Sequence, residues 1–65
     1  MKSAYELYKK GVALLETGDP AQAALVLEQA HLIEPDKASI CEALGRAYFN
    51  YGQFQEARLY FQRTL

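Results

Sequence analysis

One stretch decides the fold of this chain: Leu44-Gly45-Arg46-Ala47-Tyr48-Phe49-Asn50-Tyr51-Gly52, followed by Ala57 and Phe61. Its apolar residues recur at the spacing of an amphipathic helix, and a glycine such as Gly52 commonly ends a helix in the left-handed conformation. Ala57 and Phe61 are four residues apart, so they lie on one face of a second helix. The stretch predicts a helix, a tight turn and a second helix packed back on the first.

The same pattern occurs once more upstream, at a distance of 34 residues. All four glycines pair at this spacing, and the identical pairs are Ala4/Ala38, Gly11/Gly45, Ala13/Ala47, Gly18/Gly52, Ala23/Ala57 and Leu25/Leu59. A fixed period of this length is the signature of a repeat architecture. We therefore expect a single all-α domain over residues 1–65, made of two helical hairpins.

Four helices are expected, at about residues 3–17, 20–33, 37–51 and from 53 to the end. Gly18-Asp19-Pro20 supplies a helix stop, an N-cap and a first helical residue. Pro35 should end the second helix, because the residue before a proline is disfavoured in the α conformation. Asp36 is expected to cap the third helix. The short loops predict antiparallel neighbours, and hence two hairpins stacked side by side.

Close helix packing explains the two glycines inside helices, Gly11 and Gly45. A glycine there costs about 1 kcal/mol relative to alanine, which a close contact would offset. We expect Gly45→Leu to be the more damaging change, since the first hairpin lies at a solvated end. The residues expected to point inward on the last helix are Phe54, Ala57, Phe61, Thr64 and Leu65.

The first helices of the two copies differ in the polarity of one face. The third helix has an apolar face, consisting of Ile40, Ala43, Leu44, Ala47 and Tyr51. The counterparts on the first helix are mostly polar: Glu6, Lys9, Lys10, Ala13 and Thr17. The first hairpin therefore has the solvated face of an N-terminal repeat. The less polar C-terminal end predicts that the natural protein continues past Leu65 or that another protein covers this end.

The motif Cys41-x2-Leu44-Gly45-x2-Tyr48, with Ala57-x3-Phe61, resembles the tetratricopeptide repeat (TPR) pattern, with Cys41 in the usual place of tryptophan. The upstream copy has Lys10 in place of the usual leucine, and two leucines in place of aromatics. The resemblance implies an α-solenoid with one repeat at about residues 4–37 and an incomplete second at about 38–65. The motif residues are Leu7, Gly11, Leu14, Gly18, Ala23, Leu27, Pro35, Leu44, Gly45, Tyr48, Gly52, Ala57 and Phe61.

The resemblance implies a protein-interaction module that binds a partner peptide or helix in a concave groove. Carried over by position, the groove residues are Tyr5, Tyr8, Val12, Leu15, Ser39, Glu42, Arg46 and Phe49. TPR co-chaperones that grip an acidic C-terminus use lysine and asparagine where this chain has Tyr8, Val12 and Ala43. Such a C-terminus is therefore not the expected ligand.

Two alternatives to a peptide-binding module remain open. The first is structural: the chain is a fragment of a larger TPR array or a self-assembling homodimeric scaffold, with no separate ligand. The second is an RNA-binding helical-repeat protein, which would have a similar hairpin shape. However, a net charge of −1 and the lack of a basic stripe speak against nucleic acid.

Catalysis, metals and cofactors are not expected. Cys41 is the only cysteine, so an internal disulfide is excluded, and it most simply serves as a small buried hydrophobe. His31 lacks partners that would make it a base. The glutamates are expected to be solvated: Glu6, Glu16, Glu28, Glu34, Glu42 and Glu56. No apolar run approaches the roughly 20 residues of a membrane span, and a lone thiol favours a reducing compartment such as the cytoplasm.

Overall fold

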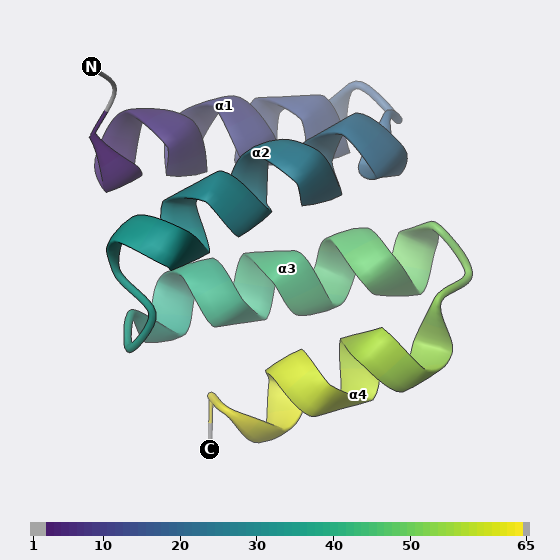
Figure 1. Ribbon diagram of the computed structural model, residues 1–65. Coiled ribbons are helices and arrows are strands. Elements are labelled where there is room, and N and C mark those ends of the chain that lie inside the picture. The colour runs from purple at the N-terminus through teal and green to yellow at the C-terminus, as the bar shows by residue number, and fades with distance from the viewer. Residues whose placement is uncertain (1–2, 65) are drawn as a thin grey trace.

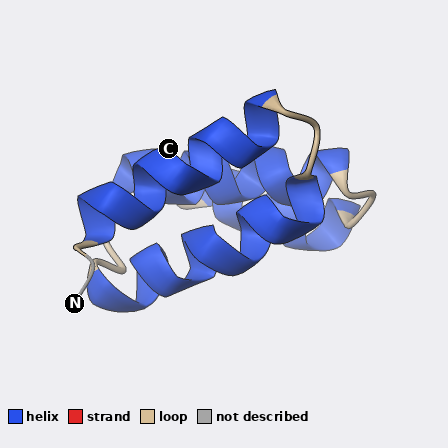
Figure 2. Cartoon of the chain, turned by 90° about the horizontal axis from the view of Figure 1, so that it is seen from above, coloured by secondary structure: helices blue, strands red, loops and turns tan. Residues whose placement is uncertain are grey.

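The computed structural model describes residues 3–64 and confirms the four expected helices (Figure 1). They are α1 (Ala4–Glu16), α2 (Pro20–Ile33), α3 (Ala38–Asn50) and α4 (Phe54–Gln62). Short loops join them, and no strand occurs within the described range (Figure 2). The observed ends lie within one or two residues of those expected, except at the C-terminal end, where α4 stops at Gln62.

Side-chain caps begin the two helices of the first hairpin. The Ser3 hydroxyl oxygen accepts from the Glu6 N–H at 3.2 Å, while the Glu6 carboxylate accepts from the Ser3 N–H at 3.2 Å. Such a reciprocal pair satisfies two otherwise unpaired donors. Asp19 caps α2 as expected, because its carboxylate accepts from the Gln22 N–H at 3.3 Å.

The expected cap at Asp36 was wrong. Lys37 is the N-cap residue of α3, and it makes no capping side-chain hydrogen bond. The Lys37 N–H instead donates to the Glu34 carbonyl at 3.3 Å, which closes a turn around Pro35. This turn delays the helix by one residue, so Asp36 lies one position before the site from which a carboxylate caps.

The same glycine turn ends the first helix of each hairpin. Gly18 has φ +82° and Gly52 has φ +87°, the left-handed region that glycine enters without steric cost. In the two turns, the Asp19 N–H donates to the Leu14 carbonyl at 2.9 Å, and the Gln53 N–H donates to the Tyr48 carbonyl at 2.8 Å. These bonds close the last turn of each helix and direct the chain back antiparallel.

The helices form a thin slab with Cα extents of 31 × 26 × 13 Å. Hairpins α1–α2 and α3–α4 pack side by side through α2 against α3 (Figure 1). α1 also touches α3. Only α3 approaches the backbone of α4 closely; α2 reaches it through side chains. One face of the slab carries α1 and α3, while α2 and α4 lie on the opposite face.

The core lies where α2 and α3 meet. Its two largest fully buried side chains are Leu27 and Leu44. Four residues of the apolar face expected on α3 are buried there: Ile40, Ala43, Leu44 and Ala47. Tyr51, expected to share that face, is 53% exposed. It is the C-cap of α3, so it lies past the last turn that the first hairpin covers.

The structure also tests what the sequence predicted for the faces of the first and last helices. The polar outer face of α1 is confirmed, because Glu6, Lys9 and Lys10 are all exposed. Phe54 does not point inward as expected but is 60% exposed, with its ring 5.2 Å from that of Phe49. The prediction for Leu65 falls outside the described residues.

The expected close contacts at the helical glycines are confirmed. A Cβ atom added at Gly11 would lie 2.5 Å from Leu27 Cγ, and one added at Gly45 would lie 2.6 Å from Phe61 Cδ1. Real Cβ atoms essentially never come this close to a neighbour. Each hairpin therefore requires glycine where its two helices approach.

Candidate protein-binding surfaces

A hollow of about 270 Å³ lies between the N-terminal ends of α1 and α3. Its lining from the helices is Ala4, Tyr5, Tyr8, Ser39 and Ile40, with Glu34 and Lys37 added by the α2–α3 loop. Three of the eight expected groove residues thus come together here: Tyr5, Tyr8 and Ser39. The hollow is mainly apolar, with one charged group of each sign on its loop side.

The two tyrosines of the hollow differ in burial. Tyr5 is 67% exposed, whereas Tyr8 is half-buried and packs against the core. The Lys9 ammonium lies 5.4 Å from the centroid of the Tyr5 ring, so a cation lies beside this ring at the edge of the polar face of α1. An exposed aromatic ring beside a cation offers a partner both apolar area and a cation–π contact.

The other five expected groove residues do not line this hollow. Val12 and Leu15 lie half-buried against the core. On α3, Arg46 and Glu42 form an ion pair with an N–O distance of 3.3 Å, and both side chains are about half exposed. Phe49 contacts Phe54 at the far end of α3 and lines a different hollow, beside α4.

Four residues of the hollow were not among the expected groove residues, namely Ala4, Glu34, Lys37 and Ile40. Ile40 was assigned to the core, and it is buried, yet it also forms the floor between the helices. Glu34 and Lys37 flank Pro35-Asp36. Their position in the loop just before α3 is the one sequence signal that would have placed them beside the N-terminal end of α3.

A carboxylate joins three helices on the opposite face. Glu28 of α2 accepts a 2.6 Å hydrogen bond from the Tyr48 hydroxyl of α3, and bonds of 3.0 and 3.1 Å from the Tyr60 hydroxyl of α4. The two tyrosine rings stack with centroids 5.7 Å apart. The expectation of a solvated Glu28 was therefore wrong. The spacing Ala24, Glu28, His31 is the missed signal, because it places Glu28 at the edge of the buried stripe.

The family assignment follows from the repeat. Residues 14–65, more than half of the chain, match the family model described as tetratricopeptide repeat. The chain belongs to the tetratricopeptide repeat family. Neither the curated proteins nor the solved structures gave a significant match. TPR units generally mediate interaction between proteins and are generally not enzymes.

The TPR hairpins carry no cluster typical of a metal site. Within residues 3–64, no group of three or more histidine, cysteine or acidic side chains is arranged to hold a metal ion. His31 Nδ1 lies 3.9 Å from the buried Cys41 thiol, and His31 Nε2 lies 3.1 Å from an Arg63 nitrogen. None of the helices in this range has the length and apolar character that a membrane crossing requires.

The hydrogen bonds from Tyr48 and Tyr60 to Glu28 should make this TPR chain less stable at alkaline pH. Burial, the hydrogen bond to Glu28 and the charge of Glu28 raise the pKa of Tyr60 to about 12, and the same causes raise the pKa of Tyr48 further. A free tyrosine titrates near pH 10. The folded state therefore holds these protons more tightly, so the stabilisation is complete below about pH 10 and is lost as the pH rises toward about 12.

Thermal melts between about pH 9 and pH 12 would check this dependence, which follows from the two raised pKa values. We expect the melting temperature of the parent to fall steeply above about pH 10, and those of Tyr48→Phe and Tyr60→Phe to fall less steeply. Tyr51→Phe, which changes an exposed tyrosine, should follow the parent. Parallel curves for all four proteins would contradict a stabilising role for the protonated hydroxyls.

Proposed function

We propose that this TPR chain binds a peptide or helical segment of a partner protein on the α1–α3 face, with the hollow at Tyr5 and Tyr8 as the anchor site. The observation that supports this most is the 67% exposure of Tyr5 at the rim of an apolar hollow. Tyrosine is enriched among the few residues that dominate binding energy at protein interfaces. The ordering cost is small, because two packed helices already hold the site.

Four of the remaining groove residues, namely Val12, Leu15, Glu42 and Arg46, form the rest of the proposed surface. Beyond the hollow, Val12 and Leu15 continue an apolar strip along α1, and the exposed Glu42–Arg46 pair lies along α3. A partner would thus meet an apolar side and a charged side. The exposed ion pair contributes mainly to specificity and association rate, since exposed pairs are worth little in affinity.

The chemistry of the face also argues against an acidic C-terminus as ligand. At the places where the chaperone clamp has lysine and asparagine, this chain has Tyr8, Val12 and Ala43. Ala43 is fully buried, so it offers no group to a ligand. Cys41 is a buried free thiol, which supports the proposal of a reducing compartment, the cytoplasm.

Tyr5→Ala is the sharpest test of the anchor site. A phage-displayed library of short linear peptides would be panned against the parent chain, and enriched peptides would be measured by fluorescence anisotropy. We expect Tyr5→Ala to weaken them about tenfold or more, in the range of an aromatic anchor. The melting temperature should hardly change, because the Tyr5 side chain is mostly in solvent.

The matched control is Tyr51→Ala, which removes another exposed tyrosine at the opposite end of α3. It should bind the enriched peptides as tightly as the parent. Failure of the library to yield any specific peptide, or equal affinities for the parent and Tyr5→Ala, would overturn the proposal. Tyr8→Ala is less informative, because Tyr8 also packs against the core.

A further inference from the structure

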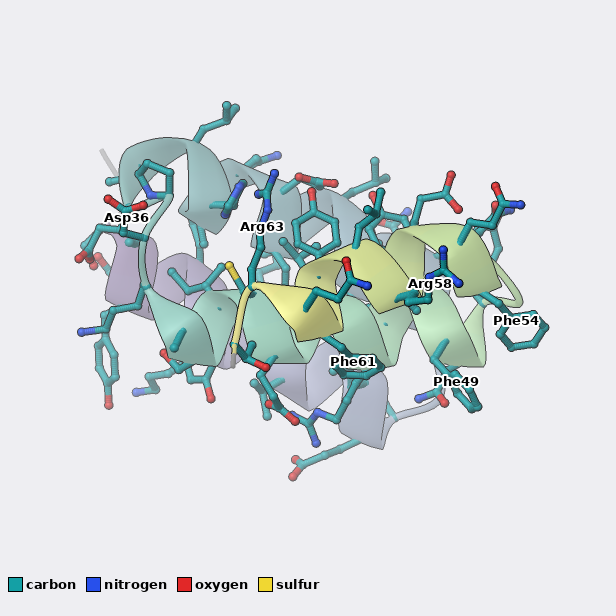
Figure 3. The ribbon with its side chains drawn as sticks, turned by 90° about the horizontal axis from the view of Figure 1, so that it is seen from below. Asp36, Phe49, Phe54, Arg58, Phe61 and Arg63 are labelled. Atoms are coloured by element: carbon teal, nitrogen blue, oxygen red, sulfur yellow. The ribbon has the colours of Figure 1, made fainter. Side chains whose placement is uncertain are left out.

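A second hollow, of about 430 Å³, lies on the outer side of the second hairpin. Its lining is Phe49, Phe54, Ala57, Arg58, Phe61, Gln62 and Thr64. Figure 3 shows the three phenylalanines along this side of α3 and α4, with Arg58 among them. Phe49 and Phe54 are each more than half exposed. Exposed apolar clusters of this kind mark interaction sites.

The first hairpin shows which occupant fits such a hollow. At 34 residues upstream, Ala23, Ala24 and Leu27 are the counterparts of Ala57, Arg58 and Phe61. All three are buried, because α2 packs against both α1 and α3. The covering residues are Ile40, Ala43, Leu44 and Ala47, at the i, i+3, i+4, i+7 spacing of one helix face. The matching occupant is an amphipathic helix with small residues in its apolar seam.

Arg58 adds a charge requirement that the first hairpin lacks. It replaces the buried Ala24, and it is exposed. Within residues 3–64 the one ion pair joins Arg46 to Glu42, so the described residues leave Arg58 unpaired. A helix that covers the hollow would remove water from beside the guanidinium. Such a charge is stable only when it is paired, and a carboxylate matches the planar guanidinium best.

A second copy of this chain fits the hollow poorly. In a head-to-tail contact, the outer face of α1 would have to fill it, and that face carries the exposed Glu6, Lys9 and Lys10. In a two-fold dimer the same patch meets itself, which brings the Arg58 side chains of both copies to one interface. Like charges placed together at an interface oppose association.

We propose that this hollow, lined by Phe49, Phe54 and Phe61, binds an amphipathic helix of another protein that carries a carboxylate opposite Arg58. This surface is separate from the α1–α3 face, so the module has two binding sites. The helix lies against α3 and α4 as α3 itself lies against the first hairpin. Its apolar seam covers the phenylalanines, and its acidic residue pairs with Arg58.

Three synthetic helical peptides would test the proposal. All carry the seam of α3, with Ile, Ala, Leu and Ala at the spacing of Ile40, Ala43, Leu44 and Ala47. The positions that flank the seam are glutamate in one peptide, glutamine in the second and lysine in the third. By fluorescence anisotropy, we expect the glutamate peptide to bind the parent chain about tenfold more tightly than the lysine peptide.

Four variants of the chain assign the site. Arg58→Glu should reverse the order of the acidic and basic peptides. Arg46→Glu, which makes the same charge change on the α1–α3 face, should keep the parental order. Phe54→Ala should weaken all three peptides severalfold without unfolding the chain, because this ring is mostly exposed. Tyr5→Ala should leave the affinities of all three helical peptides unchanged. A failure of the proposal for this hollow can therefore be told apart from a failure of the proposed α1–α3 site.

Three results would overturn the proposal. The first is that no peptide binds, and the second is that Arg58→Glu keeps the parental order. The third comes from sedimentation of the chain alone at increasing concentration: a dimer that Phe54→Ala dissociates would show that a second copy occupies the hollow. A monomer whose peptide preference reverses in Arg58→Glu supports the proposal.

Discussion

Leu44→Ala is expected to leave the chain largely unfolded at room temperature. The Leu44 side chain is fully buried at the centre of α3, the helix that packs against all the others. Truncating a buried leucine costs about 2–5 kcal/mol, because the lost contacts leave a cavity. A core of this size rarely supplies more than ~3–5 kcal/mol in total. One such substitution therefore removes most of the stability.

Leu25→Ala is the matched control, because it makes the same chemical change in α2 where the side chain is 60% exposed. Far-ultraviolet circular dichroism in a urea titration would compare the two variants with the parent. Leu25→Ala should keep the parental midpoint within the small range typical of surface positions. A cooperative, nearly parental transition for Leu44→Ala would show that the core between α2 and α3 is not the source of stability.

Gly11→Leu is expected to be more damaging than Gly45→Leu, the reverse of the order expected from the sequence. A Cβ at Gly11 meets the branch point of Leu27, a side chain with no exposed surface in the core. A Cβ at Gly45 meets the edge of the Phe61 ring instead. Phe61 is partly exposed and belongs to α4, whose backbone only α3 holds closely, so ring and helix can shift.

Overpacking a close helix contact costs about 1–3 kcal/mol or more, and we expect Gly11→Leu at or above the top of this range. Gly45→Leu should fall near its lower end. Urea midpoints of the two variants and of the parent would establish the order. Equal midpoints, or a lower one for Gly45→Leu, would mean that α4 is held as rigidly as α2.

Much of the fold could be predicted because its signals are local. Gly18 and Gly52 reach a left-handed conformation that other residues rarely adopt, and both end a helix where expected. The expected cap at Asp36 failed for an equally local reason. A turn from Glu34 to Lys37 competes with capping, and residue preferences alone do not show which of the two forms.

The candidate sites were less predictable, because they depend on which surfaces meet. Helical spacing placed Tyr5 and Tyr8 on one side of α1 but could not show that one is exposed and the other packs on the core. Phe54 has the spacing of an inward residue, yet it lies in the first turn of α4, where its ring meets the exposed Phe49 at the end of α3 and stays mostly in solvent. Its exposure creates the second hollow.

The sequence by itself determined the number of helices, their hairpin turns and the repeat, because each follows from the spacing and conformational limits of nearby residues. It also determined that glycine is needed at both close contacts. Only the tertiary structure decided that Glu28 joins α2, α3 and α4 through Tyr48 and Tyr60. These partners lie 20 and 32 residues from Glu28 along the chain, and helix packing alone brings them within hydrogen-bond distance.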